Sequence, residues 1–408
     1  MKSGNINSVT ELCQVLIRIP SENPSGAARD LVPPGVGRDV LPPSPGEAEL
    51  RRTGPHVLNS GPTTGEAQIA QFVAEFLREL GAAVELEEIA PGRPNVYGTF
   101  PTRGDRKPRL LFAPHLDTVS AGGMTVDPFA ATVRDGRIYG RGASDTKGPM
   151  AAMLWALKSV DLSTLNVAVS FAGLADEEAG QLGAKACARR KMADFVVVAE
   201  PTDLDVVFTH KGTAWIRMET TGKSAHASVP ERGVNAIERM AEVFAKLKAH
   251  FPQLCPVDEH PVLGRASISL GCVQGGTKIN VVPDHCTAEI DIRTLPGQES
   301  MVAAIQRFIK ADGLPATVTP IKISHPLFTD PEDPMIKRLL TIGSKLTGAS
   351  WFCDAAVFAE NGTPGVALGP GSITQAHTAD EFIEIRELER GATFFQKFLQ
   401  SFRNGATN

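Results

Sequence analysis

Residues 110–119, LLFAPHLDTV, join a short apolar run to a His-Leu-Asp sequence. The run has the length and composition of a buried strand, and polar groups follow directly at its end. Two further apolar runs end in the same way: residues 166–172 lead to an Asp-Glu-Glu sequence, and residues 195–199 lead to Glu200. Segments with helical spacing separate the three runs. This alternation predicts an α/β fold with polar groups beyond the carboxyl ends of the strands.

The order of the expected elements changes at about residue 206. From there we expect a strand over residues 206–221, a helix over 233–251, two strands, a second helix and a final strand ending near residue 323. This order resembles a small ferredoxin-like α+β unit. We therefore expect one domain in two parts, residues 1–205 and 324–408, with residues 206–323 inserted as a second domain.

Residues 28–66 are rich in proline and glycine and show no clear period. A structureless loop of this length is unusual inside a compact domain. The simpler interpretation is a decoration of the surface, and the alternative is a flap that covers the mouth of the active site.

The composition excludes several classes of function. Lys and Arg number 41 against 46 Asp and Glu, a net charge of −5, so binding of nucleic acid or of an anionic membrane is not expected as the main role. The chain has no run of 18 or more apolar residues, and we expect no membrane span. Its six cysteines lack CxxC spacing, which indicates a reducing compartment and favours a cytoplasmic protein.

The polar residues at the expected strand ends form a set of imidazole and carboxylate donors without sulfur. Such a set suits Zn²⁺, or Co²⁺ or Mn²⁺, and leaves coordination positions open for water. With one bridging carboxylate it could hold two cations, as in co-catalytic hydrolases. Taken singly, each residue is more often a structural histidine or a solvated acid at the start of a helix. The set consists of His115, Asp117, Asp145, Glu177, Glu178, Glu200 and His377.

The local context strengthens two members of this set. Asp117 follows His115 by two residues and could accept the second N–H of the imidazole. Asp145 lies in a turn bracketed by glycines, residues 140–148, which would hold its side chain rigidly.

Four motifs occur in order along the chain: His-Leu-Asp-Thr-Val from His115, Gly-Arg-Gly-Ala-Ser-Asp-Thr-Lys-Gly from Gly140, Asp-Glu-Glu-Ala-Gly from Asp176, and residues 369–381, GPGSITQAHTADE. In these motifs the sequence resembles the co-catalytic zinc amidohydrolase/peptidase family of acetylornithine deacetylase, succinyl-diaminopimelate desuccinylase, aminoacylase and glutamate carboxypeptidase. The resemblance extends from Leu12 to about Phe398. It implies a catalytic domain with a mixed central sheet flanked by helices, and a lid or dimerisation role for the inserted domain.

The resemblance also implies two zinc ions per subunit and a role for each residue of the set. Asp145 would bridge the ions, with His115 and Glu200 completing one site and Glu178 and His377 the other. Glu177 would act as the general base, and Asp117 would orient His115.

Four more residues match functional positions of the family. His226, in Gly-Lys-Ser-Ala-His-Ala-Ser, would reach the active site of the partner subunit in a homodimer and stabilise the oxyanion. Asn280 and Arg293 would bind the substrate, and Gly371 would line the pocket with backbone donors. The alternative for His226 is a surface loop, and for Arg293 an ion pair with Asp291.

The resulting hypothesis is a hydrolase that cleaves the amide bond of an N-acyl amino acid, of the deacetylase or desuccinylase type. A zinc-bridged hydroxide would attack the carbonyl with Glu177 as base. Glu200 disfavours the carbamoyl-amino-acid branch, which has a histidine at this position. One alternative is a metallo-dipeptidase or carboxypeptidase, and another is a metal-binding homologue without turnover, although the retained Glu177 and His226 disfavour the latter.

Overall fold

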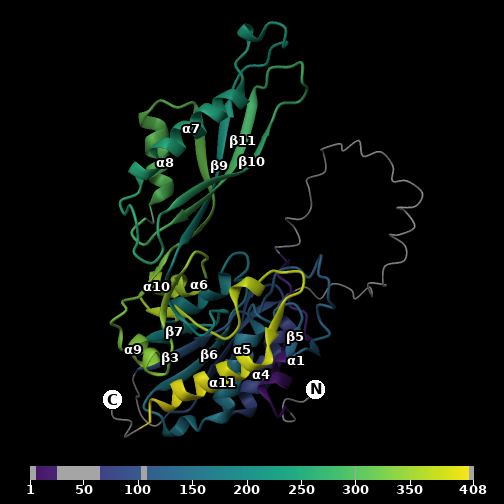
Figure 1. The fold of residues 1–408 in the computed structure, drawn as a ribbon, viewed down its shortest axis with the longest axis vertical. Coiled ribbons are helices and arrows are strands. Elements are labelled where there is room, and N and C mark those ends of the chain that lie inside the picture. The colour runs from purple at the N-terminus through teal and green to yellow at the C-terminus, as the bar shows by residue number, and fades with distance from the viewer. Residues whose placement is uncertain (1–5, 25–64, 103–107, 299, 404–408) are drawn as a thin grey trace, which may run out of the picture.

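The computed structural model describes residues 6–24, 65–102, 108–298 and 300–403 (Figure 1). Of the proline-rich segment 28–66, only Gly65 and Glu66 belong to these ranges. The hypotheses of a surface decoration or a flap therefore lie outside the described residues.

A nine-stranded mixed sheet forms the centre of the larger part of the molecule. In spatial order its strands are β1 (Ala83–Ala90), β2 (Arg93–Thr99), β6 (Ala168–Gly173), β3 (Arg109–Ala113), β7 (Phe195–Val198), β15 (Gly365–Ala367), β8 (Val206–His210) and β13 (Leu327–Phe328), and β14 (Leu346–Ala349) also pairs with β8. Strands β6, β3, β7 and β15 run parallel to one another. Their carboxyl ends therefore share one edge of the sheet.

Helices cover both faces of this sheet (Figure 1). On β3, Leu110 and Phe112 join the core beneath α1 (Val9–Ile17), α4 (Ala67–Glu79), α5 (Lys147–Ser159), α9 (Pro334–Thr341) and α11 (Ile385–Gln400). The alternate residues Leu111 and Ala113 join a second core beneath α6 (Leu182–Arg189) and α10 (Ala355–Glu360). Because side chains alternate along a strand, burial on both faces explains the continuous apolar run in the sequence. We call this sheet and its helices the large domain.

The sequence of α11 explains how it covers the sheet. Leu388, Ala392, Phe395 and Leu399 recur at intervals of three and four residues, and all four are buried. The ring of Phe395 meets that of Phe112 edge to face, with centroids 5.5 Å apart. This spacing forms one apolar stripe along the helix.

The second, antiparallel sheet has the strand order β10 (Ser267–Gly275), β11 (His285–Thr294), β9 (Gly212–Thr221) and β12 (Ala316–Ser324). Helices α7 (Ala236–Leu254) and α8 (Met301–Ala311) share one core with it. The chain order β-α-β-β-α-β and this strand order confirm the expected ferredoxin-like unit. We call it the inserted domain, and Figure 1 shows it extending away from the large domain.

The chain passes between the two sheets at different residues from those expected. Residues 206–221 do not form one strand, because Val206–His210 pairs within the large sheet and only Gly212–Thr221 lies in the inserted domain. Gly212 lies at this crossing, where a Cβ atom would approach the carbonyl oxygen of Ser324 to 2.6 Å. Asn280 lies in a turn before β11.

A small third sheet joins distant parts of the chain next to the candidate site. Its order is β16 (Phe382–Glu384), β5 (Arg137–Tyr139) and β4 (Thr132–Arg134). Pairing of β16 with β5 brings the segment after His377 beside the turn that precedes Asp145. The 3-10 helices among the described residues are η2 (Leu162–Thr164), η3 (Pro230–Arg232) and η4 (Ile373–Gln375). Among the described helices, none has the length and apolar character to cross a membrane.

Candidate metal centre

Five side chains meet beyond the carboxyl edge of the parallel strands. His115 follows β3, Glu178 follows β6, Glu200 follows β7, and His377 lies in the loop after β15, whereas Asp145 belongs to the turn before α5. They form two groups, His115–Asp145–Glu200 and Asp145–Glu178–His377, and within each group the donor atoms lie within 4.8 Å of one another. Asp145 belongs to both groups.

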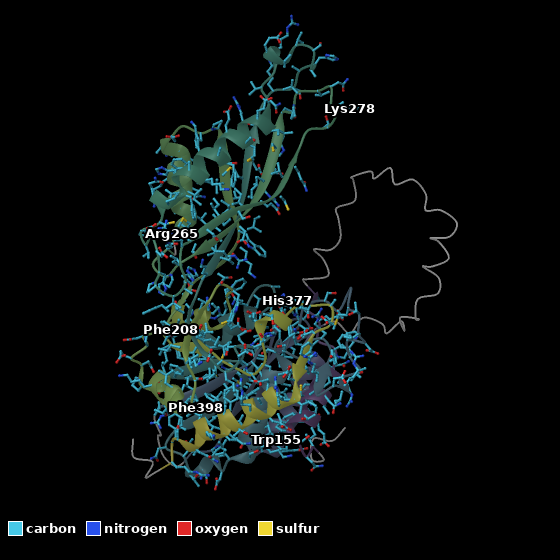
Figure 2. All side chains as sticks on the ribbon, viewed as in Figure 1. Trp155, Phe208, Arg265, Lys278, His377 and Phe398 are labelled. Carbon is cyan, nitrogen blue, oxygen red and sulfur yellow. The ribbon has the colours of Figure 1, made fainter. Side chains whose placement is uncertain are left out.

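The two oxygens of Asp145 face different imidazoles. Nε2 of His115 lies 3.0 Å from Oδ1, and Nε2 of His377 lies 3.3 Å from Oδ2. His377 Nε2 is also 3.2 Å from Oε2 of Glu178. Figure 2 shows His377 at the margin of the large domain that faces the inserted domain. An imidazole facing each oxygen of Asp145 is the arrangement expected of a carboxylate that bridges two cations.

Burial and mutual repulsion dominate the electrostatics of the centre. Burial, and then the charge of Asp354, raise the pKa of Glu177 well above its usual value. Burial and the charge of Asp145 do the same for Glu200. Hydrogen bonds to Asp145 and Glu178 raise the pKa of His377 to about 10. The carboxylates therefore draw positive charge into the centre.

The donor set fits a pair of divalent cations. In the described ranges, no lysine or arginine forms an ion pair with Asp145, Glu177, Glu178 or Glu200. The Oε1 atom of Glu178 is buried and has no hydrogen-bond partner among the described residues. Burying so many carboxylates without compensation is costly. Nitrogen and oxygen donors suit zinc and similar cations, which would supply the missing charge.

Asp117 contacts the centre differently from the expectation. Nδ1 of His115 donates to the backbone carbonyl of Asp117 at 2.9 Å, whereas the Asp117 carboxylate is 3.6 Å away. That carboxylate accepts instead from the backbone N–H groups of Glu177 and Glu178 and from the amide of Asn23. Because these donors occupy its oxygens, the carboxylate holds the Glu177–Glu178 turn and the backbone carbonyl orients the imidazole.

Glu381 is a supporting residue that the sequence reasoning missed. Its buried carboxylate accepts from Nη1 of Arg141 at 2.7 Å and from the backbone N–H groups of Gly142, Ser144 and Asp145. It thereby joins the turn of Asp145 to the loop of His377. Its position four residues after His377, within a quoted motif, was the available signal.

The structure does not bring every candidate residue to the centre. His226 is exposed on the inserted domain, where its Nδ1 accepts from the backbone N–H of Ser228. Asn280 lies beside it, since its carbonyl accepts from Ala227. Arg293 pairs with Asp291 through Nε and Nη2, at 3.1 and 3.0 Å.

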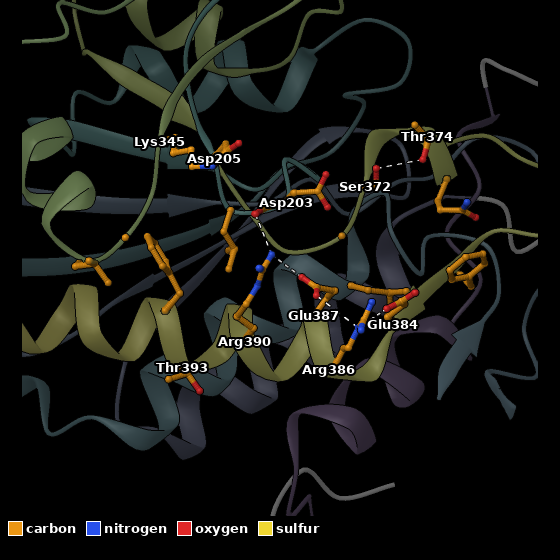
Figure 3. Close-up of a pocket in the computed structure, with 18 of the residues that line it drawn as sticks. Asp203, Asp205, Lys345, Ser372, Thr374, Glu384, Arg386, Glu387, Arg390 and Thr393 are labelled. Carbon is orange, nitrogen blue, oxygen red and sulfur yellow. Dashed lines mark hydrogen bonds and ion pairs between the residues drawn. The ribbon is translucent and has the colours of Figure 1, made fainter. Parts of the chain in front are cut away.

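Gly371 lines a groove of about 890 Å³ between the 371–375 loop and α11 (Figure 3). The groove is bordered by charged residues of α11, among them Arg386 and Arg390, and by Asp203. None of the five metal-ligand candidates is among its lining residues. A Cβ atom on Gly371 would lie 2.9 Å from Oγ of Ser144, so glycine permits this loop to pack against the Asp145 turn.

Comparison with known proteins places these features in one family. The family model described as peptidase family M20/M25/M40 matches residues 111–401. Acetylornithine deacetylase of Proteus mirabilis is 31% identical over 354 residues, which cover 82% of this chain and 89% of the relative.

Two solved structures have a similar fold. An M20-family metallo-carboxypeptidase of Sulfolobus solfataricus has a TM-score of 0.73 at 18% identity, covering 97% of this chain and 99% of the other. A dinuclear metal-binding M20 peptidase of Bacillus subtilis has a TM-score of 0.62 at 15% identity, covering 96% of each chain.

Proposed function

Because the chain belongs to the M20/M25/M40 peptidase family, and is therefore a metal-dependent hydrolase of amide or peptide bonds, we propose that it cleaves the amide bond of an N-acyl amino acid. The observation that carries this proposal is the shared carboxylate of Asp145, which lies between two groups that each hold one imidazole and one further carboxylate. The relative at 31% identity, a deacetylase, supports a small acyl group as the part removed.

We propose that each subunit binds two divalent cations. Zn²⁺ is the proposed metal, and Co²⁺ and Mn²⁺ are the alternatives. His115, Asp145 and Glu200 would hold one, and Asp145, Glu178 and His377 the other. When bound, such cations polarise the amide carbonyl and acidify a water molecule. The dinuclear relative of similar fold supports the number of ions.

Glu177 is the proposed general base. It is buried beside the centre, and the Asp117 carboxylate holds its backbone N–H. Its Oε would accept a proton from the attacking water and then deliver it to the departing nitrogen. Because an activated water molecule would be the nucleophile, the mechanism needs no nucleophilic serine or cysteine.

The inserted domain supplies the proposed substrate contacts. His226 would donate to the carbonyl oxygen at the active site of a partner subunit in a homodimer, since it is exposed and its Nε2 is directed away from the Ser228 contact. Arg293 and Asn280 would bind the substrate carboxylate, and Gly371 would contribute backbone donors. Arg293 would then exchange Asp291 for the substrate.

A dipeptidase or carboxypeptidase is the second candidate function. The fold shared with a metallo-carboxypeptidase is compatible with it, because a terminal carboxylate next to an amide is common to both substrate classes. A metal-binding protein without turnover is disfavoured by the family membership and by Glu177.

All six cysteines are free, which supports our proposal of a reducing compartment such as the cytoplasm.

A hydrolysis screen tests the proposal. Protein loaded with Zn²⁺ or Co²⁺ is assayed with N-acetyl amino acids, N-succinyl amino acids and dipeptides, each with and without a chelator. We expect chelator-sensitive release of a free amine from at least one N-acyl amino acid. Cleavage of dipeptides alone would favour the second candidate, and absence of turnover on all three classes would overturn the proposal.

A further inference from the structure

Arg93 lies between two buried carboxylates, those of Glu66 and Asp176. Its Nε and Nη2 donate to the two oxygens of Glu66, at 2.8 and 2.5 Å, and its Nη1 donates to Oδ1 of Asp176 at 2.8 Å. The side chains of Arg93, Glu66 and Asp176 are 9%, 0% and 4% exposed. The guanidinium therefore joins β2 to the start of α4 and to the segment after β6.

These contacts continue without a break to the turn itself. The amide of Asn23 donates to Oδ1 of Asp176 at 3.1 Å and to Oδ2 of Asp117 at 2.7 Å. Asp117 in turn accepts the N–H groups of Glu177 and Glu178, each at 3.1 Å. The backbone of the proposed base and of one proposed metal ligand, Glu177 and Glu178, is thus held by hydrogen bonds that lead back to Arg93. We define the Arg93 network as Glu66, Arg93, Asp176, Asn23 and Asp117.

Asp176 has a backbone conformation that needs such support. Its φ of 72° lies in the left-handed region, which non-glycine residues adopt only when their surroundings compensate. Its N–H donates to Oε1 of Glu66, and its carbonyl accepts from Gly180 and Gln181. A Cβ atom on Gly180 would lie 2.4 Å from Oδ2 of Asp176, so the turn closes tightly around this residue.

We propose that Arg93 is a positioning residue for this hydrolase: by bridging Glu66 and Asp176 it sets the orientation of the Glu177–Glu178 turn. The inference rests on the proposed function. The Arg93 network then determines the placement of the base, Glu177, which governs turnover. It also determines the placement of Glu178, which governs retention of a cation in the Asp145–Glu178–His377 group.

The geometry requires arginine rather than any cation. The planar guanidinium donates in two directions at once, to both oxygens of Glu66 and to Asp176. A lysine ammonium is a single point and cannot reproduce both contacts from the same backbone position. Arg93→Lys therefore keeps the charge while it removes the bridge.

The control is Arg109→Lys, in a more exposed ion pair whose side chains are 37% and 36% exposed. Arg109 also binds one carboxylate through Nε and Nη2, that of Asp194, but it lies at the amino-terminal end of β3, opposite to the edge that holds the candidate centre. Both variants exchange the same side chain within an ion pair. Only the Arg93 exchange should affect the turn.

The experiment compares folded wild-type protein, Arg93→Lys and Arg109→Lys by titration with Co²⁺ alone, and by kcat and KM with the substrate that the screen identifies. For Arg93→Lys we expect affinity for one of two Co²⁺ ions to fall roughly tenfold or more, and kcat to fall by a similar factor with little change in KM. Arg109→Lys should match wild type in all three quantities. An Arg93→Lys protein with unchanged Co²⁺ affinities and kcat but a lower Tm would overturn the inference, because Arg93 would then serve stability only.

Glu66→Gln provides a second variant if Arg93→Lys does not fold. The amide retains the size of the Glu66 side chain but has only one oxygen as acceptor. In the wild type, both oxygens of Glu66 accept hydrogen bonds, from Arg93 and from the backbone N–H of Asp176. We expect a smaller loss in the same two quantities, and unchanged values would contradict the inference. If wild type hydrolyses nothing in the screen, the proposed function fails, whereas the Co²⁺ titrations still decide the role of the Arg93 network.

Discussion

At the scale of single residues, a substitution of Glu177 can distinguish cation binding from proton transfer. It stands beside the donor atoms but belongs to neither metal-ligand group. We expect Glu177→Gln to bind the same amount of metal as wild type, while kcat falls by about 10²–10⁴-fold, because the amide cannot accept a proton. Metal analysis and steady-state kinetics on the same preparation measure both. Turnover near the wild-type rate would show that another group is the base.

Glu381 provides a second prediction at this scale. Replacing one of its oxygens by an NH₂ group in Glu381→Gln would set a donor against backbone N–H groups of the Asp145 turn. We expect affinity for Co²⁺ to fall roughly 10- to 100-fold, as is usual when a partner of a ligand is lost. Glu384→Gln is the control, since Glu384 pairs with Arg386 at the surface. Equal affinities for the two variants would contradict the supporting role of Glu381.

The metal-ligand candidates and the residues that support them differ in how far the sequence could predict them. His115, Asp145, Glu178, Glu200 and His377 stand in motifs and at expected strand ends, and the structure brings all five together. Arg93 has no such signal, because its partners Glu66 and Asp176 lie far away in the chain and a lone arginine in a strand is most often exposed.

At the scale of elements, the end of β8 contains a histidine that must stay neutral. His210 is fully buried, its Nδ1 donates to the carbonyl of Lys211, and its Nε2 accepts from the backbone N–H of Cys353. Burial lowers the pKa of His210 from 6.5 to about 4. The junction between the two sheets therefore depends on an unprotonated imidazole.

The sign of the pH effect follows from this pKa. Between pH 6.5 and 4 the unfolded chain binds a proton at this site and the folded chain does not, so stability is present above pH 6.5 and is lost as the pH falls. The contribution approaches about 3 kcal/mol. We expect urea unfolding of wild type to show a steeper loss of stability over this range than that of His210→Asn. Parallel pH profiles would contradict the assignment.

The strands themselves show where prediction from local sequence ends. The apolar runs before His115 and Glu200 were predicted as strands and form β3 and β7. The expected strand over 206–221 divides at Lys211, because its first half pairs with β15 and its second half with β11 and β12. Both halves favour a strand locally, and only the choice of partner separates them.

At the scale of the whole molecule, the proposed homodimer, in which His226 of one subunit serves the active site of the other, predicts complementation between subunits. Mixing Glu177→Gln with His226→Ala should yield mixed dimers in which one active site has an intact Glu177 and, from the partner, an intact His226. With random exchange of subunits, roughly a quarter of the sites would be restored. Activity of the remixed sample, compared with each variant alone, measures this. No recovery in verified mixed dimers would indicate that His226 acts within its own chain or not at all.

The sequence by itself determined the α/β class and the ferredoxin-like unit, and its resemblance to the hydrolase family selected the five candidate donors. These depend on periodicity, on the order of elements and on motifs, which are properties of neighbouring residues. The tertiary structure alone decided which oxygen of Asp145 faces which imidazole, why the carboxylate of Asp117 holds the turn rather than His115, and how Arg93 and Glu381 support the centre. These hydrogen bonds join residues 27 to 240 positions apart in the chain. They depend on how strands pair and helices pack, which local sequence patterns do not reveal.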